Sequence, residues 1–210
     1  MKKTFITAIC FLSLCAATAQ KAQIGLMVGG ANSNFKTKSE DEDLNGKSKT
    51  GMAGGVVANF GLSEKCSIRS GLVLVQKGSK VEETFGGSTM SAEINTTWLE
   101  VPVSLTYNTG NFFVGAGPSL SFGVGGKWKS KVDDEEESGK VSFGNSDDDN
   151  MKGFDFGANV LAGFQFNNGL FIAANFNQGF SNLTAGDSGD DSIKSHYFGL
   201  HLGYMFKGKK

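Results

Sequence analysis

Every second residue is apolar in the stretch from Val114 to Val124, and most residues between them are glycine or serine. This period of two is typical of a β-strand, whose successive side chains point to opposite faces. One face carries Val114, Ala116, Pro118, Leu120, Phe122 and Val124, and the other carries Gly115, Gly117, Ser119, Ser121 and Gly123. The apolar face points inward in a water-soluble barrel and outward to lipid in a membrane barrel. Its orientation therefore decides the class of protein.

Eight segments of the chain show this alternation, and none shows a sustained helical period. They span roughly 24–34, 51–62, 66–78, 95–107, 112–126, 153–166, 169–180 and 195–206. Long connections at 35–50, 79–94, 127–152 and 181–194 alternate with short ones at 63–65, 108–111 and 167–168. In an up-and-down meander this alternation places all long loops at one end. The pattern predicts an all-β fold, an eight-stranded antiparallel transmembrane β-barrel with short periplasmic turns and four long extracellular loops.

The charges follow the same plan. Of the 21 acidic residues, 18 fall in the four long connections, and the third, 127–152, is the most polar. We expect acidic loops, with the third one mobile. Arg69 is the only arginine, and the acidic residues offset the 20 basic ones, which argues against a nucleic-acid partner.

The second face of the strands decides the orientation. A face turned to water is normally rich in lysine and glutamate, but this one consists mainly of glycine, alanine, serine and asparagine. Its expected charges are Arg69, Lys77, Glu100 and Asp155, two positive and two negative. Such a set suits a crowded barrel interior in which charges pair. We therefore predict that the apolar face meets lipid, and that these four residues form a charge network in the lumen.

Aromatic residues at the ends of the apolar face support the same orientation. Two girdles around an aliphatic band are typical of membrane barrels. The girdle near the short turns is predicted at Phe60, Tyr107, Phe112, Phe166, Tyr204 and Phe206, and the one near the long loops at Phe122, Phe154, Phe176 and Phe198. Pro102 and Pro118 interrupt two strands, and we expect a bulge at each because proline removes a ladder hydrogen bond.

The chain begins with the features of a secretory signal peptide. Two lysines precede a short apolar stretch, which ends at the small-residue pattern of Ala17 and Ala19. We expect residues 1–19 to be removed and residues 20–210 to form the barrel. Cys66 is then the only cysteine, so no intrachain disulfide forms.

Several sequence blocks together resemble a known family. They are SGLVLVQKGSK at 70–80, WLEVPVSLTY at 98–107, FFVGAGPSLSF at 112–122, FDFGANVLAGFQF at 154–166 and LFIAANFNQGFSNL at 170–183. They are similar to the PorT-like outer-membrane β-barrel family of Bacteroidota. The resemblance implies the fold and the outer-membrane location, and it makes both prolines look like family features. It does not fix an activity. The family usually ends on the last aromatic residue, whereas KGKK follows Phe206 here.

Motifs of catalysis and cofactor binding are absent from the sequence. It contains no Gly-x-Ser-x-Gly, His-Glu-x-x-His or phosphate-loop pattern, and we expect neither an enzyme nor a cofactor. His201 points inward, and we expect it to be a packed interior histidine. The segment from Asp41 to Gly46 opens like a calcium loop, but Met52 stands where the loop needs glutamate. We expect an ordinary acidic loop and no metal site.

The sequence thus predicts an integral outer-membrane barrel with a lumen plugged by side chains, acting as a structural or surface-binding protein through its long loops. A narrow pore for small solutes and a component of a protein-secretion apparatus are the alternatives. The expected partners are outer-membrane lipid, the barrel-assembly machinery, and divalent cations or surface ligands at the acidic loops.

Overall fold

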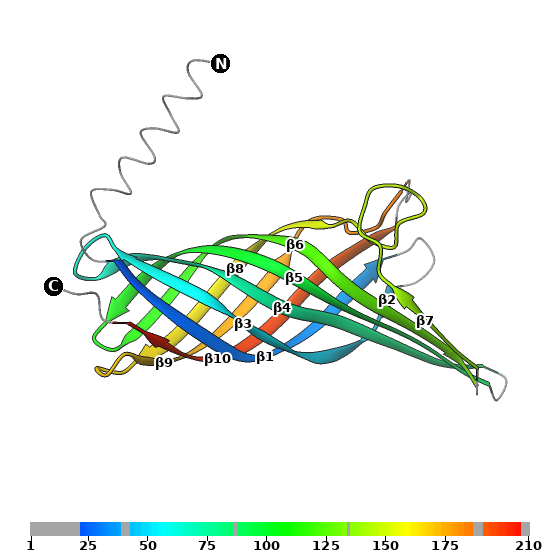
Figure 1. Cartoon of the computed structure of the whole chain (residues 1–210), viewed down its shortest axis with the longest axis horizontal. Coiled ribbons are helices and arrows are strands. Elements are labelled where there is room, and N and C mark those ends of the chain that lie inside the picture. The colour runs from blue at the N-terminus through cyan, green and yellow to red at the C-terminus, as the bar shows by residue number, and fades with distance from the viewer. Residues whose placement is uncertain (1–21, 39–42, 86–87, 134, 187–190, 207–210) are drawn as a thin grey trace, which may run out of the picture.

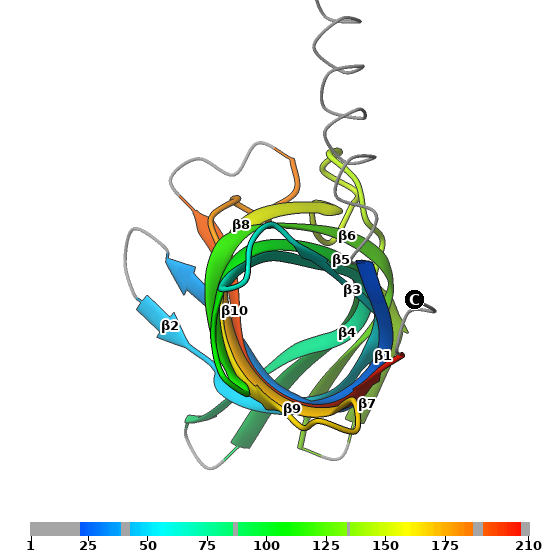
Figure 2. The same ribbon diagram turned by 90° about the vertical axis from the view of Figure 1, so that its left-hand side faces the viewer.

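The computed structural model describes residues 22–38, 43–85, 88–133, 135–186 and 191–206, and these form one closed antiparallel barrel (Figures 1 and 2). The predicted signal peptide lies outside the described residues. The strands are β1 Ala22–Lys38, β2 Asp43–Asn45, β3 Lys47–Gly61, β4 Cys66–Phe85, β5 Ser88–Thr109, β6 Phe112–Val132, β7 Glu135–Lys140, β8 Phe154–Gln165, β9 Leu170–Gly179 and β10 Ser192–Met205. No helix long and apolar enough to cross a membrane occurs among the described residues.

Eight of these strands make the barrel wall. Their order is β1, β3, β4, β5, β6, β8, β9 and β10, and β10 pairs with β1 to close the ring. Each wall strand pairs with the wall strands before and after it in the sequence, as in an up-and-down meander, and each covers most or all of one of the eight alternating segments. The predicted fold class is therefore confirmed. The short strands β2 and β7 lie outside the wall, where they pair with β1 and β6.

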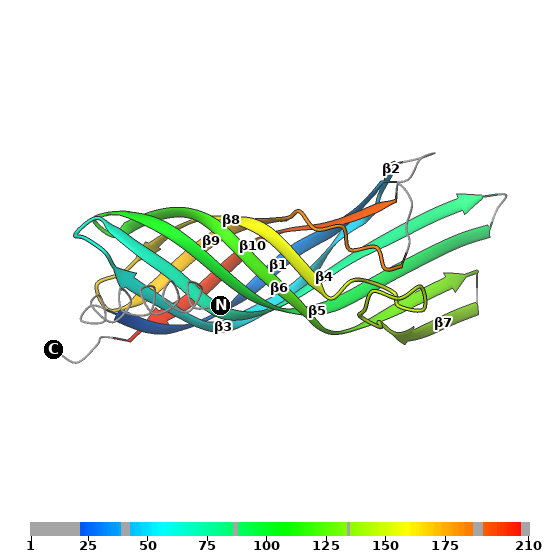
Figure 3. The same ribbon diagram turned by 90° about the horizontal axis from the view of Figure 1, so that it is seen from above.

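The long connections differ from the prediction. Much of 35–50, 79–94 and 127–152 continues the strands in hairpins that project from one end of the barrel (Figure 3). The third connection is also packed, because Phe143 lies edge-on to Trp98 at 5.3 Å and Met151 is 2% exposed. The expectation of a mobile third loop is wrong. Charged residues do not by themselves indicate a loop here, because a strand beyond the membrane has a solvated face where charged residues are stable.

The bulges expected at Pro102 and Pro118 are also wrong. The register between β4 and β5 is the same on both sides of Pro102, and the register between β5 and β6 is the same on both sides of Pro118. At each proline the ladder omits two residue pairs and then resumes. The ladder thus tolerates the hydrogen bond missing at each proline without inserting an extra residue into the strand. The shift between β5 and β6 lies instead between Thr97 and Trp98.

The apolar face of the wall points outward. Leu202 is 62% exposed and Val114 is 54% exposed, whereas Trp98 and Tyr197 are buried in the lumen. The same alternation holds along all eight wall strands. Contiguous exposed apolar surface on this scale is typical of a protein that is covered by lipid or by a partner. The predicted orientation of the two faces is confirmed.

Candidate functional site

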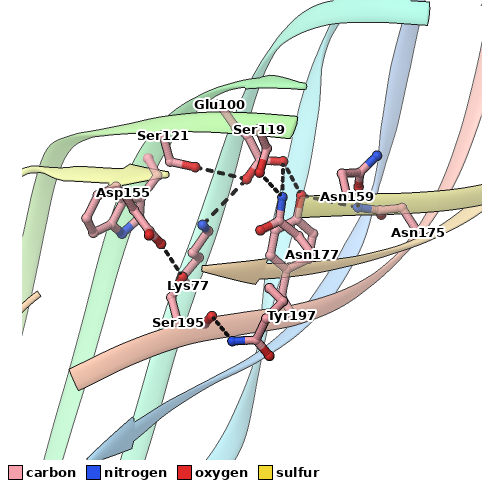
Figure 4. Close-up of polar contacts among 12 residues, drawn as sticks. Lys77, Glu100, Ser119, Ser121, Asp155, Asn159, Asn175, Asn177, Ser195 and Tyr197 are labelled. Atoms are coloured by element: carbon pink, nitrogen blue, oxygen red, sulfur yellow. Dashed lines mark hydrogen bonds and ion pairs between the residues drawn. The ribbon is translucent and has the colours of Figure 1, made fainter. Parts of the chain in front are cut away.

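The lumen is filled by side chains at both ends. Near the short turns Phe113, Phe171 and Met205 form a buried apolar cluster. Towards the projecting hairpins a second cluster contains Trp98 and Tyr197. The layer between them is polar, and its centre is the pair of Lys77 and Glu100 (Figure 4).

Glu100 is the hub of the polar layer. Its Oε1 accepts hydrogen bonds from the Tyr197 hydroxyl at 2.6 Å and from Nδ2 of Asn177 at 3.2 Å. Its Oε2 accepts one from the Ser121 hydroxyl at 3.2 Å. These donors come from β10, β9 and β6, so one carboxylate on β5 ties together four strands around the lumen. A buried carboxylate is stable only with such a set of partners.

Lys77 reaches the same carboxylate from β4. Its Nζ lies 3.5 Å from Oε2 of Glu100, and both side chains are almost fully buried. Nζ makes no hydrogen bond within the described residues. It lies 5.2 Å from the centre of the Tyr197 ring and 5.4 Å from that of Trp98. The ammonium group is therefore stabilised by one carboxylate and by the faces of two rings.

Neither of the other two predicted network residues forms an ion pair with Lys77 or Glu100, although Asp155 interacts electrostatically with both. Asp155 is buried on β8, where it accepts hydrogen bonds from the Ser195 hydroxyl at 2.6 Å and the Ser181 backbone N–H at 3.3 Å. The Arg69 guanidinium lies between two rings, 4.4 Å from Phe113 and 4.5 Å from Phe171. Arg69 thus belongs to the apolar cluster near the short turns, and among the four predicted residues the structure brings only Lys77 and Glu100 together as an ion pair.

A second polar set continues the layer towards the short turns. Asn175 donates to Oδ1 of Asn159 at 3.0 Å and to the Tyr197 hydroxyl at 3.3 Å, and Asn159 donates to Ser104 at 3.2 Å. The sequence analysis did not single out Tyr197, Asn175 or Asn177 as partners. Their inward positions were readable from the alternation, but their heights in the lumen depend on the barrel shear.

The space left in this layer is small. A cavity of about 60 Å³ is bordered by Met27, Arg69, Glu100, Asn175 and His201. Such a volume holds one or two water molecules. Nε2 of His201 is buried there without a hydrogen-bond partner among the described residues. No group of three or more histidine, cysteine or acidic residues is placed to hold a metal ion in the described ranges.

The predicted girdle residues lie on the outer surface at the two ends of the wall. Tyr107, Phe112, Phe166, Tyr204 and Phe206 are exposed near the short turns, and Phe122, Phe154, Phe176 and Phe198 are exposed near the hairpins. Phe60 is half-buried. Each girdle contains one pair of neighbouring rings in contact, Tyr204 with Phe206 and Phe122 with Phe154, both at 5.4 Å between ring centres. The calcium-like segment at 41–46 lies partly outside the described residues.

The comparison with family models agrees with the observed class of fold. The model of the outer membrane protein beta-barrel domain family matches residues 18–185. It describes a broader family than the PorT-like one. A comparison with curated proteins found no match.

Among solved structures the chain is similar to Ail, the attachment invasion locus protein of Yersinia pestis. The two share 16% identity with a TM-score of 0.42, over 88% of this chain and 99% of that one. For Neisserial surface protein A the identity is 10% and the TM-score 0.43, over 88% and 99%. For the outer membrane protein OprG from Pseudomonas aeruginosa they are 12% and 0.40, over 89% and 97%.

Proposed function

The chain belongs to the outer membrane protein beta-barrel domain family, and from this premise we propose that it is a closed-lumen barrel that acts through its projecting hairpins. Outer-membrane lipid surrounds the wall, and the barrel-assembly machinery inserts it. The observation that carries the proposal is the filled interior, in which the Lys77–Glu100 layer lies between two apolar clusters. Since the lumen offers no open path, we infer that the function lies at the projecting hairpins.

The hairpin end offers surface for a ligand. A hollow of about 260 Å³ opens there, and its lining includes Phe35, Val81, Ile94 and Trp128. Apolar walls with a few polar groups are typical of ligand sites. Acidic side chains of the connecting segments are the places where divalent cations or charged surface ligands would bind. The narrower PorT-like resemblance rests on the sequence blocks, and a role in protein secretion stays a prediction.

We also infer that the protein acts without catalysis. His201 is the candidate base in the lumen, yet its Nε2 makes no hydrogen bond with a described side chain. A serine or cysteine nucleophile needs such a contact. The small cavity beside it also leaves no room for a substrate of ordinary size.

The proposal requires the projecting hairpins to lie outside the cell and the short turns inside the envelope. Labelling of single cysteines on intact cells tests this orientation. In a Cys66→Ser background, Ser138→Cys on β7 should react with a membrane-impermeant maleimide, since position 138 is exposed on a projecting hairpin. Ser63→Cys in a short turn is the control and should react only after the cells are broken. Equal labelling of both sites on intact cells, or labelling of Ser63→Cys alone, would contradict the proposal.

A further inference from the structure

Lysine side chains form a layer on the outside of the barrel, immediately beyond the aromatic girdle near the projecting hairpins. On β6 the outward-facing residue Val124 is followed, three positions later, by Lys127 and then Lys129. At about 3.3 Å per residue Lys127 lies roughly 10 Å along the strand from this apolar residue. We define the lysine belt as Lys36, Lys49, Lys127, Lys129, Lys140 and Lys194.

Two pairs in this belt place like charges directly opposite each other. Lys127 on β6 pairs with Lys140 on β7, and Lys36 on β1 pairs with Lys194 on β10. All four side chains are exposed, and none forms an ion pair with an acidic side chain in the described part of the chain. Like charges in direct cross-strand pairs are destabilising. An anion between the two ammonium groups of each pair would remove this cost.

An open groove lies beside the first pair. Its volume is about 600 Å³, and its lining includes Lys49, Gln76, Asn95, Lys127 and Lys129. The stem of Lys49 crosses the outer face over Gly78, where an added Cβ would stand 3.3 Å from its Cδ. Lys49 and Lys129 are held in place by Glu93 and Glu136. The groove therefore presents ammonium and amide donors at the height where the apolar wall ends.

We propose that the lysine belt binds the phosphate groups of an anionic lipid in the outer leaflet of the membrane. A phosphate oxygen accepts charge-assisted hydrogen bonds from two ammonium groups at once. The belt faces the same side as the lipid-facing wall, so a lipid whose chains lie along Val124 has its headgroup at Lys127. A ligand free in solution would contact the lysines but not the apolar wall below them, whereas a membrane lipid contacts both. The inference rests on the outer-membrane placement proposed above and not on the closed lumen.

The test is a titration of the folded mature protein, in a nonionic detergent, with lipid A that carries two phosphate groups. Lipid A without phosphate is the matched probe. The Lys127→Gln/Lys140→Gln variant should bind the phosphorylated form about 30-fold more weakly, which corresponds to about 1 kcal/mol for each lysine beside an anionic lipid surface. Lys36→Gln/Lys194→Gln should show a loss of the same kind at the second pair.

Lys65→Gln/Lys131→Gln is the charge-matched control. It removes one lysine near a short turn and one farther out on β6, and its affinity should equal that of the wild type. Heat-modifiable migration on gels verifies that every variant is folded. Equal affinity of the wild type for both forms of lipid A would overturn the proposal, and so would equal losses in the control and Lys127→Gln/Lys140→Gln. Failure of the surface labelling on intact cells would instead refute the outer-membrane placement. The two failures are distinguishable because the titration uses purified protein in detergent and does not depend on where the protein lies in the cell.

Discussion

Replacing Glu100 with glutamine should destabilise the barrel by leaving the charge of Lys77 unpaired. Glutamine keeps the shape of the side chain and can still accept a hydrogen bond from Tyr197, so the main loss is the ion pair at 3.5 Å. Removing one partner of a buried pair costs about 3–5 kcal/mol. The rings of Trp98 and Tyr197 remain near the ammonium group and offset part of this cost. We expect a loss of about 3 kcal/mol.

The free energy of unfolding is measured by urea titration in lipid vesicles, with tryptophan fluorescence as the signal. The double variant Lys77→Met/Glu100→Gln removes both charges of the pair and should regain about 2 kcal/mol relative to Glu100→Gln. Glu136→Gln, in a half-exposed pair with Lys129, should be indistinguishable from the wild type. A harmless Glu100→Gln, or a double variant as unstable as the single one, would refute the reasoning.

Three further predictions follow from the outer wall and the hairpins. Leu202→Arg should cost about 2–4 kcal/mol in bilayers if the site lies near the midplane, and a harmless arginine there would reverse the assignment of the faces. Met151→Ala should cost about 2–4 kcal/mol by the same urea titration, because the side chain is buried in the apolar cluster that contains Trp98 and Tyr197; no loss would mean that the third connection does not pack against the barrel. Hydrogen bonds from Lys47 and Lys80 lower the pKa of Glu82 from 4.5 to about 2. The ionised carboxylate therefore stabilises the hairpin above pH 4.5, and this contribution is lost as the pH falls towards 2. The rate at which a protease cleaves the hairpin should increase over this fall in pH in the wild type but not in Glu82→Gln.

The barrel could be predicted from the sequence because its main signal is local. Leu202 and Gly203 are neighbours in the chain, and the alternation they belong to fixes which of them faces lipid. The turns are equally local, as in the left-handed Gly110 and Gly169 of two short connections. Such signals do not depend on how the strands are staggered around the ring.

The contacts of the interior network could not be predicted from the sequence, although the face on which each residue lies could be. Glu100 and Tyr197 are 97 residues apart, and their contact depends on the shear accumulated over several strands. Arg69 was grouped with the other lumen charges because it shares their face, yet its height places it between Phe113 and Phe171. In a barrel the face of a residue is set by its strand, whereas its height relative to other strands is set by the whole ring.

The projecting strands carry a local signal of their own in the sequence. Lys127, Lys129 and Lys131 recur at every second position, as do Lys36 with Lys38 and Lys47 with Lys49 in NFKTK and GKSKT. This is the strand period with lysine in place of leucine. The charge at these positions was read as the composition of a loop, although the alternation indicated strands that continue beyond the lipid.

A scan of β10 with spin labels at single cysteines, in Cys66→Ser protein folded into bilayers, tests directly whether the lumen is closed and the wall faces lipid. Oxygen, which concentrates in lipid, and a water-soluble nickel complex serve as relaxation agents. A closed barrel in lipid should give high oxygen access at Leu200 and Leu202, and low access for both agents at Tyr197 and His201, which are buried in the lumen. High nickel access at the two inward sites would reveal an open aqueous channel and contradict the closed lumen, and high nickel access at the two leucines would show that the apolar wall does not face lipid.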